Sequence, residues 1–266
     1  MSFSPIAIVG RACLLPGADG PEALWKAVNK GRDLLSRAPA DRWRVPSSDI
    51  LTDPPLGRDA SDPDRTWSDR GGYVQGFEER FDPEGFAISA ADIRGMDPLL
   101  QWALHTARQA ISEVRTRPEA ARMGLVMGNL SFPSSGLSRY AEQVWLNAST
   151  AVDADAMAAL ELDRMEPRDR FMSGLPALKV AEALGLKGSA MALDAACASS
   201  LVAIKYAIDQ LHDGRADLML AGAVNRADDL FIHVGFCALK AMSTSGRSRP
   251  FHAQADGLVP AEGAGF

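Results

Sequence analysis

One cysteine, Cys197, stands where an apolar strand pattern changes into a helical pattern. Residues 190–194 form a short apolar run typical of a buried strand, and residues 197–212 have the apolar spacing of a helix that Gly214 would end. The unpaired N–H groups and the positive dipole end of such a helix stabilise an anion. We therefore expect the thiolate form of Cys197 to be favoured there, which would make it a nucleophile at neutral pH.

The residues around Cys197 suit the chemistry of an acyl thioester. Ala195, Ala196 and Ala198 are small and leave room for an acyl group, and the Cys197 N–H could donate to an oxyanion that forms beside the sulfur. A purely structural interpretation competes with this one, because free cysteine is often a small buried hydrophobic residue. One face of the predicted helix would carry Cys197, Leu201, Ile204, Ile208 and Leu211. Spacing alone leaves both interpretations open.

The other two cysteines have no such setting. Cys13 follows the first apolar run and Cys237 lies within another, so we expect both to be packed. The spacing of the three cysteines and four histidines gives no metal-ligand pattern, which predicts no metal site. Reduced thiols favour a cytoplasmic location.

The composition indicates a globular protein with enough apolar residues for a core: 47% of the 266 residues are hydrophobic and 23% are charged. The net charge is −6, and no Lys- or Arg-rich run is present, which argues against binding to nucleic acid or to an anionic membrane. The first ten residues do not have the pattern of a signal peptide, and no apolar run has the length of a membrane span.

The order of elements predicts an α/β protein. Apolar strand patterns occur at residues 6–10, 123–127, 190–194 and 218–222, and the last residues, 257–266, have the pattern of a further buried strand. Helical patterns occur at residues 21–31, 97–114, 173–184 and 197–212. Alternating strands and helices predict a mixed, largely parallel sheet with helices on both faces.

Two segments interrupt this alternation. Residues 36–72 are rich in Pro, Asp, Arg and Ser. We interpret them as a long surface excursion and not as a linker, because aromatic residues (Trp43, Trp67, Tyr73) occur along them. Residues 129–172 are interpreted as a loop and helical insertion, with its clearest helical piece at 154–162.

The segment Asp194-Ala-Ala-Cys-Ala-Ser-Ser-Leu201 resembles the active-site signature of the β-ketoacyl synthases, the condensing enzymes of fatty acid and polyketide synthesis. Further segments resemble landmarks of this family in the same order, at residues 5–18, 81–89, 96–98, 221–225 and 248–265. Ala196 and Ala198 stand where modular polyketide synthases commonly have Thr and Ser, and together with residues 226–237 they look more like the synthases of polyunsaturated fatty acids and related iterative systems. Several ordered matches are far more specific than one cysteine motif.

The resemblance implies a thiolase-like α/β fold, of which residues 1–266 would be the N-terminal half, and we expect the sequence to be truncated before the C-terminal half. It implies that Cys197 takes an acyl group from the phosphopantetheine thiol of an acyl carrier protein. A malonyl thioester would then lose carbon dioxide, and its carbanion would attack the acyl group. No cofactor would be bound directly, other synthase domains would be partners, and the full-length protein would form a homodimer.

The family also uses two histidines in motifs C-terminal to the cysteine. His105, His212, His233 and His252 match neither motif, and we assign none of them a catalytic role. An alternative is therefore a non-catalytic ketosynthase-like partner or degenerate fragment that binds a carrier protein or a synthase subunit. The intact setting of Cys197 argues against this alternative, because a partner that only binds needs no reactive thiol.

Overall fold

The structure is a computed structural model that describes residues 4–40, 42–43, 45–52, 64–130, 134–148, 168, 171–226 and 230–266. The chain divides into two compact units. Unit 1 comprises residues 1–14, 76–225 and 264–266, and unit 2 comprises residues 15–75 and 226–263. Among the described residues, none of the helices combines the length and the apolar character that crossing a membrane requires.

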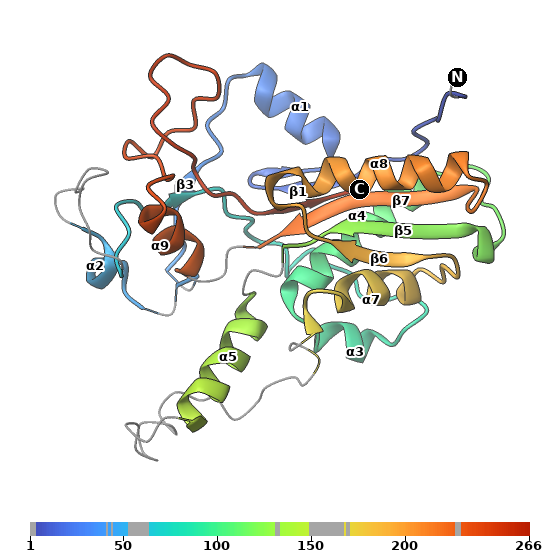
Figure 1. Cartoon of the computed structure of the whole chain (residues 1–266), viewed down its shortest axis with the longest axis horizontal. Coiled ribbons are helices and arrows are strands. Elements are labelled where there is room, and N and C mark those ends of the chain that lie inside the picture. Colours follow the sequence, from blue (N-terminus) through green and yellow to red (C-terminus); the bar gives the residue numbers. More distant parts are fainter. Residues whose placement is uncertain are drawn as a thin grey trace. The chain divides into compact units, whose positions relative to one another are not determined.

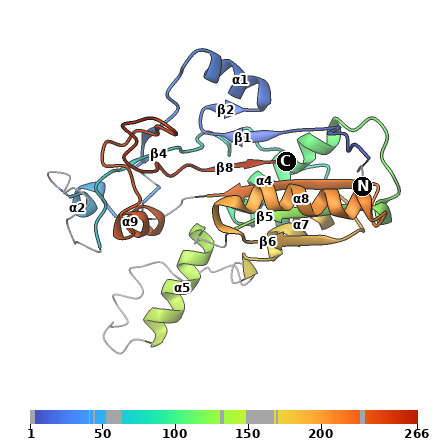
Figure 2. The same cartoon turned by 45° about the horizontal axis from the view of Figure 1, so that its top comes forward.

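Five strands of the main sheet follow one another in the order β1-β8-β7-β5-β6 (Figures 1 and 2). These strands are β1 (Cys13–Leu15), β5 (Met123–Gly128), β6 (Ala190–Leu193), β7 (Leu218–Asn225) and β8 (Gly263–Gly265). β5 pairs in parallel with both β6 and β7, whereas β1 pairs antiparallel with β8. Every residue of β5 is buried, as a central strand covered on both faces requires. The expectation of a mixed, largely parallel sheet is confirmed.

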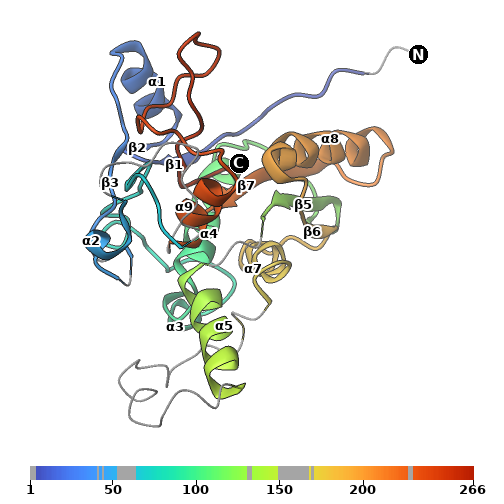
Figure 3. The same ribbon diagram turned by 60° about the vertical axis from the view of Figure 1, so that its left-hand side comes forward.

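Helices cover both faces of this sheet (Figures 2 and 3). α8 (Ser199–His212) packs on β7 and β5 from one side, and α7 (Leu175–Ala183) packs on β5 and β6 from the other, together with α4 (Pro98–Ser112). Asp97 begins α4, since its carboxylate accepts a hydrogen bond from the Leu99 N–H at 2.8 Å. The described residues of unit 1 also form the helices α3 (Ala90–Arg94) and α5 (Ser135–Ala148).

The first predicted strand is wrong. Residues 6–10 form no strand, and Ile8 is 87% exposed; the strand lies later, at β1. An apolar run becomes a strand only where a neighbour offers backbone partners. The ladder with β8 reaches Ala12, which exchanges two hydrogen bonds with Phe266, and among the described residues no strand lies beside residues 6–10.

The prediction that residues 36–72 form a surface excursion is corrected by the structure of unit 2. Trp43, Trp67 and Tyr73 are all at least 93% buried, so the segment supplies part of a core. Its elements are β2 (Ala18–Asp19), α1 (Pro21–Asn29), β3 (Ser36–Arg37), α2 (Ser47–Ile50), β4 (Arg70–Gly71) and α9 (Phe231–Ala238). β3 and β4 form a two-stranded antiparallel sheet. The predicted helix at residues 154–162 lies outside the described residues.

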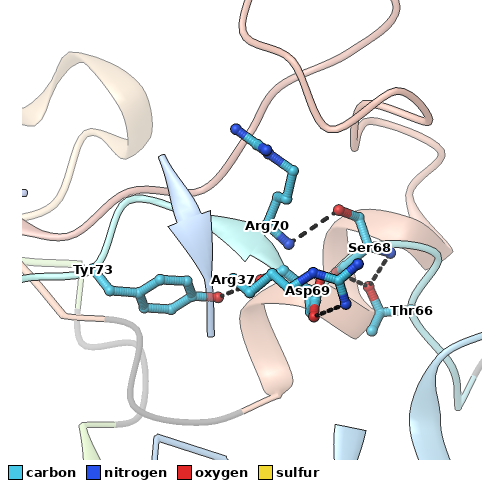
Figure 4. Close-up of polar contacts among 6 residues, drawn as sticks. All are labelled: Arg37, Thr66, Ser68, Asp69, Arg70 and Tyr73. Carbon is cyan, nitrogen blue, oxygen red and sulfur yellow. Dashed lines mark hydrogen bonds and ion pairs between the residues drawn. The ribbon is translucent and has the colours of Figure 1, made fainter. Parts of the chain in front are cut away.

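Polar contacts fix the chain around β4 (Figure 4). The Tyr73 hydroxyl donates to the Asp69 carbonyl oxygen at 3.2 Å, and Arg37 pairs with the Asp69 carboxylate at 3.3 Å. The Arg70 N–H donates to the Ser68 hydroxyl at 3.1 Å. The bonds of Tyr73 and Ser68 satisfy backbone groups in a segment that has little regular structure of its own.

Candidate functional site

The carboxyl ends of three parallel strands meet at one edge of the sheet in unit 1. Gly128 at the end of β5 is in register with Leu193 of β6 and Ala223 of β7. Beyond these ends, the Asn129 N–H donates to the Leu193 carbonyl oxygen at 3.0 Å. Open α/β sheets place ligands outside the carboxyl ends of their strands. The chain that leaves β6 therefore delivers Cys197 to the edge where a substrate is expected.

Cys197 lies in a short 3-10 helix, Ala196–Ala198, that precedes α8. We expected the α-helix itself to begin at Cys197, and this prediction is wrong by two residues. The cause is a tight turn: Ala196 has φ +50°, a left-handed conformation that is rare for residues with a Cβ atom. The turn ends β6 and lets the chain enter the helix in a new direction, with the thiol just ahead of its N-terminus.

Hydrogen bonds hold this turn in its uncommon conformation. The Asp194 carboxylate accepts from the Ala196 N–H at 2.8 Å, and the Ala198 N–H donates to the Ala195 carbonyl oxygen at 3.1 Å. Asp side chains commonly bond the backbone two residues later in this way. Strained backbone of this kind persists only where its surroundings over-determine it, and it is found preferentially at functional sites.

Ser199 is the residue that connects the turn to the helix, a role that was not predicted from the sequence. Its hydroxyl donates to the Ala196 carbonyl oxygen at 2.7 Å and accepts from the Ala195 N–H at 3.0 Å, and the residue is only 2% exposed. The sequence does show a small hydroxyl residue two positions after the cysteine. Serine is common at helix starts, so its presence alone does not indicate this role.

The Cys197 side chain is exposed, and so is the helix face that it shares. Leu201 is 69% exposed and Ile204 is 45% exposed. The buried residues of α8 lie on another face and are Ser199, Ala203, Ala207 and Gln210. In the structure, the interpretation of Cys197 as a packed core residue is therefore wrong. Within the described residues, the hydrogen bonds of the turn leave the Cys197 N–H without an acceptor, so it can donate to a ligand.

The other two thiols are placed as expected. Cys13 is half-buried in β1 of unit 1. Cys237 is buried in unit 2, where its sulfur lies 3.4 Å from the Thr66 hydroxyl and 3.5 Å from the Met242 sulfur. Burial raises the pKa of the Cys237 thiol, which disfavours the reactive thiolate.

The four histidines have structural settings. In unit 1, His105 packs edge-on against the rings of Phe77 and Phe81, and the His212 ring lies 2.9 Å from the Ser4 carbonyl oxygen. In unit 2, His252 accepts from the Gln254 N–H, and the fully buried His233 bonds the Tyr73 hydroxyl at 3.1 Å. Within the described ranges, no group of three or more His, Cys, Asp or Glu side chains is placed to hold a metal ion.

Comparisons with known proteins identify the family to which the chain belongs. The family model of the β-ketoacyl synthase N-terminal domain matches residues 3–266. The chain is 35% identical over 272 residues to the pikromycin polyketide synthase component PikAIII of Streptomyces venezuelae, covering 99% of the chain and 16% of that protein. It is 34% identical over 270 residues to the mycoketide-CoA synthase of Mycobacterium tuberculosis, covering the whole chain and 6% of that protein.

Among solved structures, the PfaC keto synthase-chain length factor matches with a TM-score of 0.82 and 33% identity, over 97% of this chain and 28% of that one. The oxazolomycin ketosynthase domain OzmH KS7 matches with a TM-score of 0.73 and 24% identity, over 97% of this chain and 42% of that one. At that identity the second match concerns the fold alone. The chain spans less than a fifth of the length of the two curated relatives that it matches.

Proposed function

Since the chain belongs to the β-ketoacyl synthase family, whose N-terminal domain model it matches over residues 3–266, we propose that Cys197 is the nucleophile that accepts an acyl group for carbon–carbon bond formation. The expected fold, the N-terminal half of a thiolase-like ketosynthase, is confirmed by the match to PfaC. The observation that carries the proposal is the placement of an exposed Cys197 in a strained turn at the carboxyl edge of parallel strands.

The proposed first step is a transthioesterification. The Cys197 thiolate attacks the carbonyl carbon of an acyl group that is bound as a thioester to the phosphopantetheine of an acyl carrier protein. A tetrahedral oxyanion forms, and the Cys197 N–H, which has no acceptor among the described residues, is available to stabilise it. The carbon–sulfur bond to the carrier breaks, the carrier thiolate takes up a proton, and the acyl group remains on Cys197.

In the proposed second step, a malonyl thioester loses carbon dioxide, and the resulting enolate attacks the acyl carbon on Cys197. A 3-oxoacyl thioester forms and the Cys197 thiolate is released. The groups that stabilise the enolate are not assigned to His105, His212, His233 or His252, since each of these has the structural setting described above. Residues 1–266 thus supply the acyl-accepting part of a condensing domain.

Partners follow from the same proposal. One of the relatives reported above is named as a component of a polyketide synthase, and the other as a mycoketide-CoA synthase. We propose that this chain works with an acyl carrier protein and other synthase domains, in the cytoplasm, and that the full domain is a homodimer. A ketosynthase-like partner that only binds would not need an exposed thiol in a pre-formed turn.

Intact-protein mass spectrometry tests the acyl transfer. The chain is incubated with hexanoyl phosphopantetheinyl carrier protein, and one hexanoyl adduct is expected on Cys197. The adduct should be absent from Cys197→Ser and present in Cys13→Ser, which serves as the matched control. An adduct that survives in a folded Cys197→Ser variant, or a folded wild-type chain that takes no acyl group from any carrier-bound thioester, would contradict the proposal.

A further inference from the structure

Unit 2 contains a surface hollow of about 730 Å³, far in sequence from Cys197. This volume lies within the range of about 300–1,000 Å³ that is usual for small-molecule sites. Its apolar wall is formed by Leu15, Pro16, Leu24, Leu34 and Leu35, and its charged residues are Arg32, Asp33, Arg70, Arg247, Arg249 and Glu262. An apolar wall beside a few convergent charges is the usual composition of a ligand site.

The two carboxylates of the hollow are already paired. Asp33 lies 2.8 Å from the guanidinium of Arg70, and the buried Glu262 lies 3.3 Å from that of Arg42, which does not line the hollow. In the described parts of the chain, no ion pair involves Arg32, Arg247 or Arg249. Three uncompensated positive charges therefore line one hollow of a chain whose net charge is −6.

The loop that carries two of these arginines is held in place. The Asp256 carboxylate accepts hydrogen bonds from the Ser243 and Thr244 hydroxyls and from the Ser245 N–H, at 2.8–3.1 Å. The Arg249 guanidinium donates to the Gln254 carbonyl oxygen at 3.1 Å. A ligand would meet a basic loop that needs little ordering on binding.

The loop also lies against Arg70. A Cβ atom at Gly246, which has φ +63°, would lie 2.9 Å from the Arg70 Cδ. In Figure 4 the Arg70 side chain extends away from the contacts among Thr66, Ser68 and Asp69. Arg70 therefore joins the arginines of the loop at the hollow instead of the Asp69 cluster.

We propose that this hollow binds the phosphate group of a small ligand whose apolar part rests on the leucine wall. Guanidinium groups match phosphate oxygens in geometry and form paired, charge-assisted hydrogen bonds with them. We expect the ligand to be amphipathic, because contact between its apolar part and the leucines removes apolar surface from water. The inference does not depend on the chemistry of Cys197.

Isothermal titration calorimetry of the 266-residue chain tests the site with two probes, inorganic phosphate and hexyl phosphate. Both should bind at one site, hexyl phosphate at least about tenfold more tightly because its alkyl chain buries methylene groups. Arg247→Gln and Arg32→Gln should each weaken hexyl phosphate binding by about tenfold, through loss of a charge-assisted bond. Arg115→Gln, which removes an exposed arginine of unit 1, should leave binding unchanged.

Three results would overturn the proposal. One is the absence of saturable binding of either probe to the folded chain. Another is equal affinity of wild type, Arg32→Gln and Arg247→Gln for hexyl phosphate, which would place the ligand elsewhere. The third is displacement of hexyl phosphate by hexaglutamate at lower concentration than by hexyl sulfate, which would identify the hollow as a contact for an acidic polypeptide.

Discussion

Gly128 and Ser199 are in such close contact that a Cβ atom at residue 128 would lie 2.8 Å from the Ser199 Cβ. This contact joins the end of a central strand to the start of the helix behind Cys197. The Ser199 hydroxyl in turn bonds the backbone of Ala195 and Ala196, the two residues before the thiol. The position of Cys197 therefore depends on a chain of contacts that runs from β5 through Ser199 to the turn.

Ser199→Ala should loosen this turn. It removes both hydroxyl hydrogen bonds and leaves the Ala195 N–H without its partner, at an expected cost of about 1–3 kcal/mol in the free energy of unfolding. The rate of Cys197 alkylation by iodoacetamide should also fall. Urea denaturation and timed mass spectrometry measure the two effects. Ser200→Ala, an exposed neighbour, should change neither, and an unchanged alkylation rate in Ser199→Ala would show that the hydroxyl does not position the thiol.

Gly128→Ala should destabilise the chain by displacing the start of α8. The new methyl group would meet the Ser199 Cβ at 2.8 Å and the Ser199 carbonyl carbon at 3.0 Å, and overpacking of this kind costs about 1–3 kcal/mol. Gly235→Ala in α9 is the control, because nothing lies within 4 Å of its Cβ position and alanine favours a helix. If both variants unfold at the same urea concentration, the close contact has no energetic consequence.

The sequence was sufficient to locate Cys197 because the change from strand to helix is a local pattern. It was not sufficient for the left-handed conformation within the turn, since the residue that adopts it is Ala196, where a glycine would have been the usual signal. The roles of Ser199 and Gly128 depend on residues that lie far apart in the chain and meet only in the folded sheet.

The errors elsewhere have the same physical origin. Residues 6–10 have the apolar pattern of a strand, but strand formation depends on a partner that local sequence does not reveal. The burial of Trp43 and Trp67 was signalled by their type, yet their polar surroundings favoured a surface loop. The basic hollow could not be predicted because Arg32, Arg70 and Arg247 come from three distant segments.

Ala196→Val tests the backbone conformation of the turn. A β-branched side chain at φ +50° meets strong steric conflict, so we expect a loss of about 1–3 kcal/mol in the free energy of unfolding. Ala198→Val is the matched control: Ala198 has φ −91°, which a valine accepts, and it is also exposed. Chemical denaturation compares the two, and equal stability would mean that residue 196 does not need its left-handed conformation in solution.

His233 should make stability sensitive to acid. Burial lowers its pKa from 6.5 to about 4 in the folded protein, while the unfolded chain keeps the ordinary value. Below pH 6.5 the unfolded state therefore binds a proton that the folded state does not. The unfolding free energy should fall as the pH drops from about 6.5 to about 4, by up to about 3 kcal/mol from this residue.

His233→Gln isolates this contribution, because its side chain does not titrate. The readout is the slope of the unfolding free energy against pH between 6.5 and 4.5, and not the overall stability of the variant. The slope should be smaller than in wild type. Identical slopes in the two proteins would mean that His233 is protonated as easily in the folded state as in the unfolded one.

The three cysteines should differ sharply in their reaction with iodoacetamide in the native state. Cys197 is exposed, Cys13 is half-buried, and Cys237 is buried with a raised pKa. Alkylation needs both access and thiolate, so we expect the order Cys197, Cys13, Cys237, with at least about tenfold between the first and the last. Peptide mapping after timed quenching gives the three rates, and the same reaction in 6 M guanidinium removes the differences in access and burial.

The three alkylation rates should converge in 6 M guanidinium, because the order comes from the fold and not from the neighbouring residues. Native alkylation of Cys237 as fast as that of Cys197 would show that unit 2 opens readily and that exposure in the folded state does not single out Cys197.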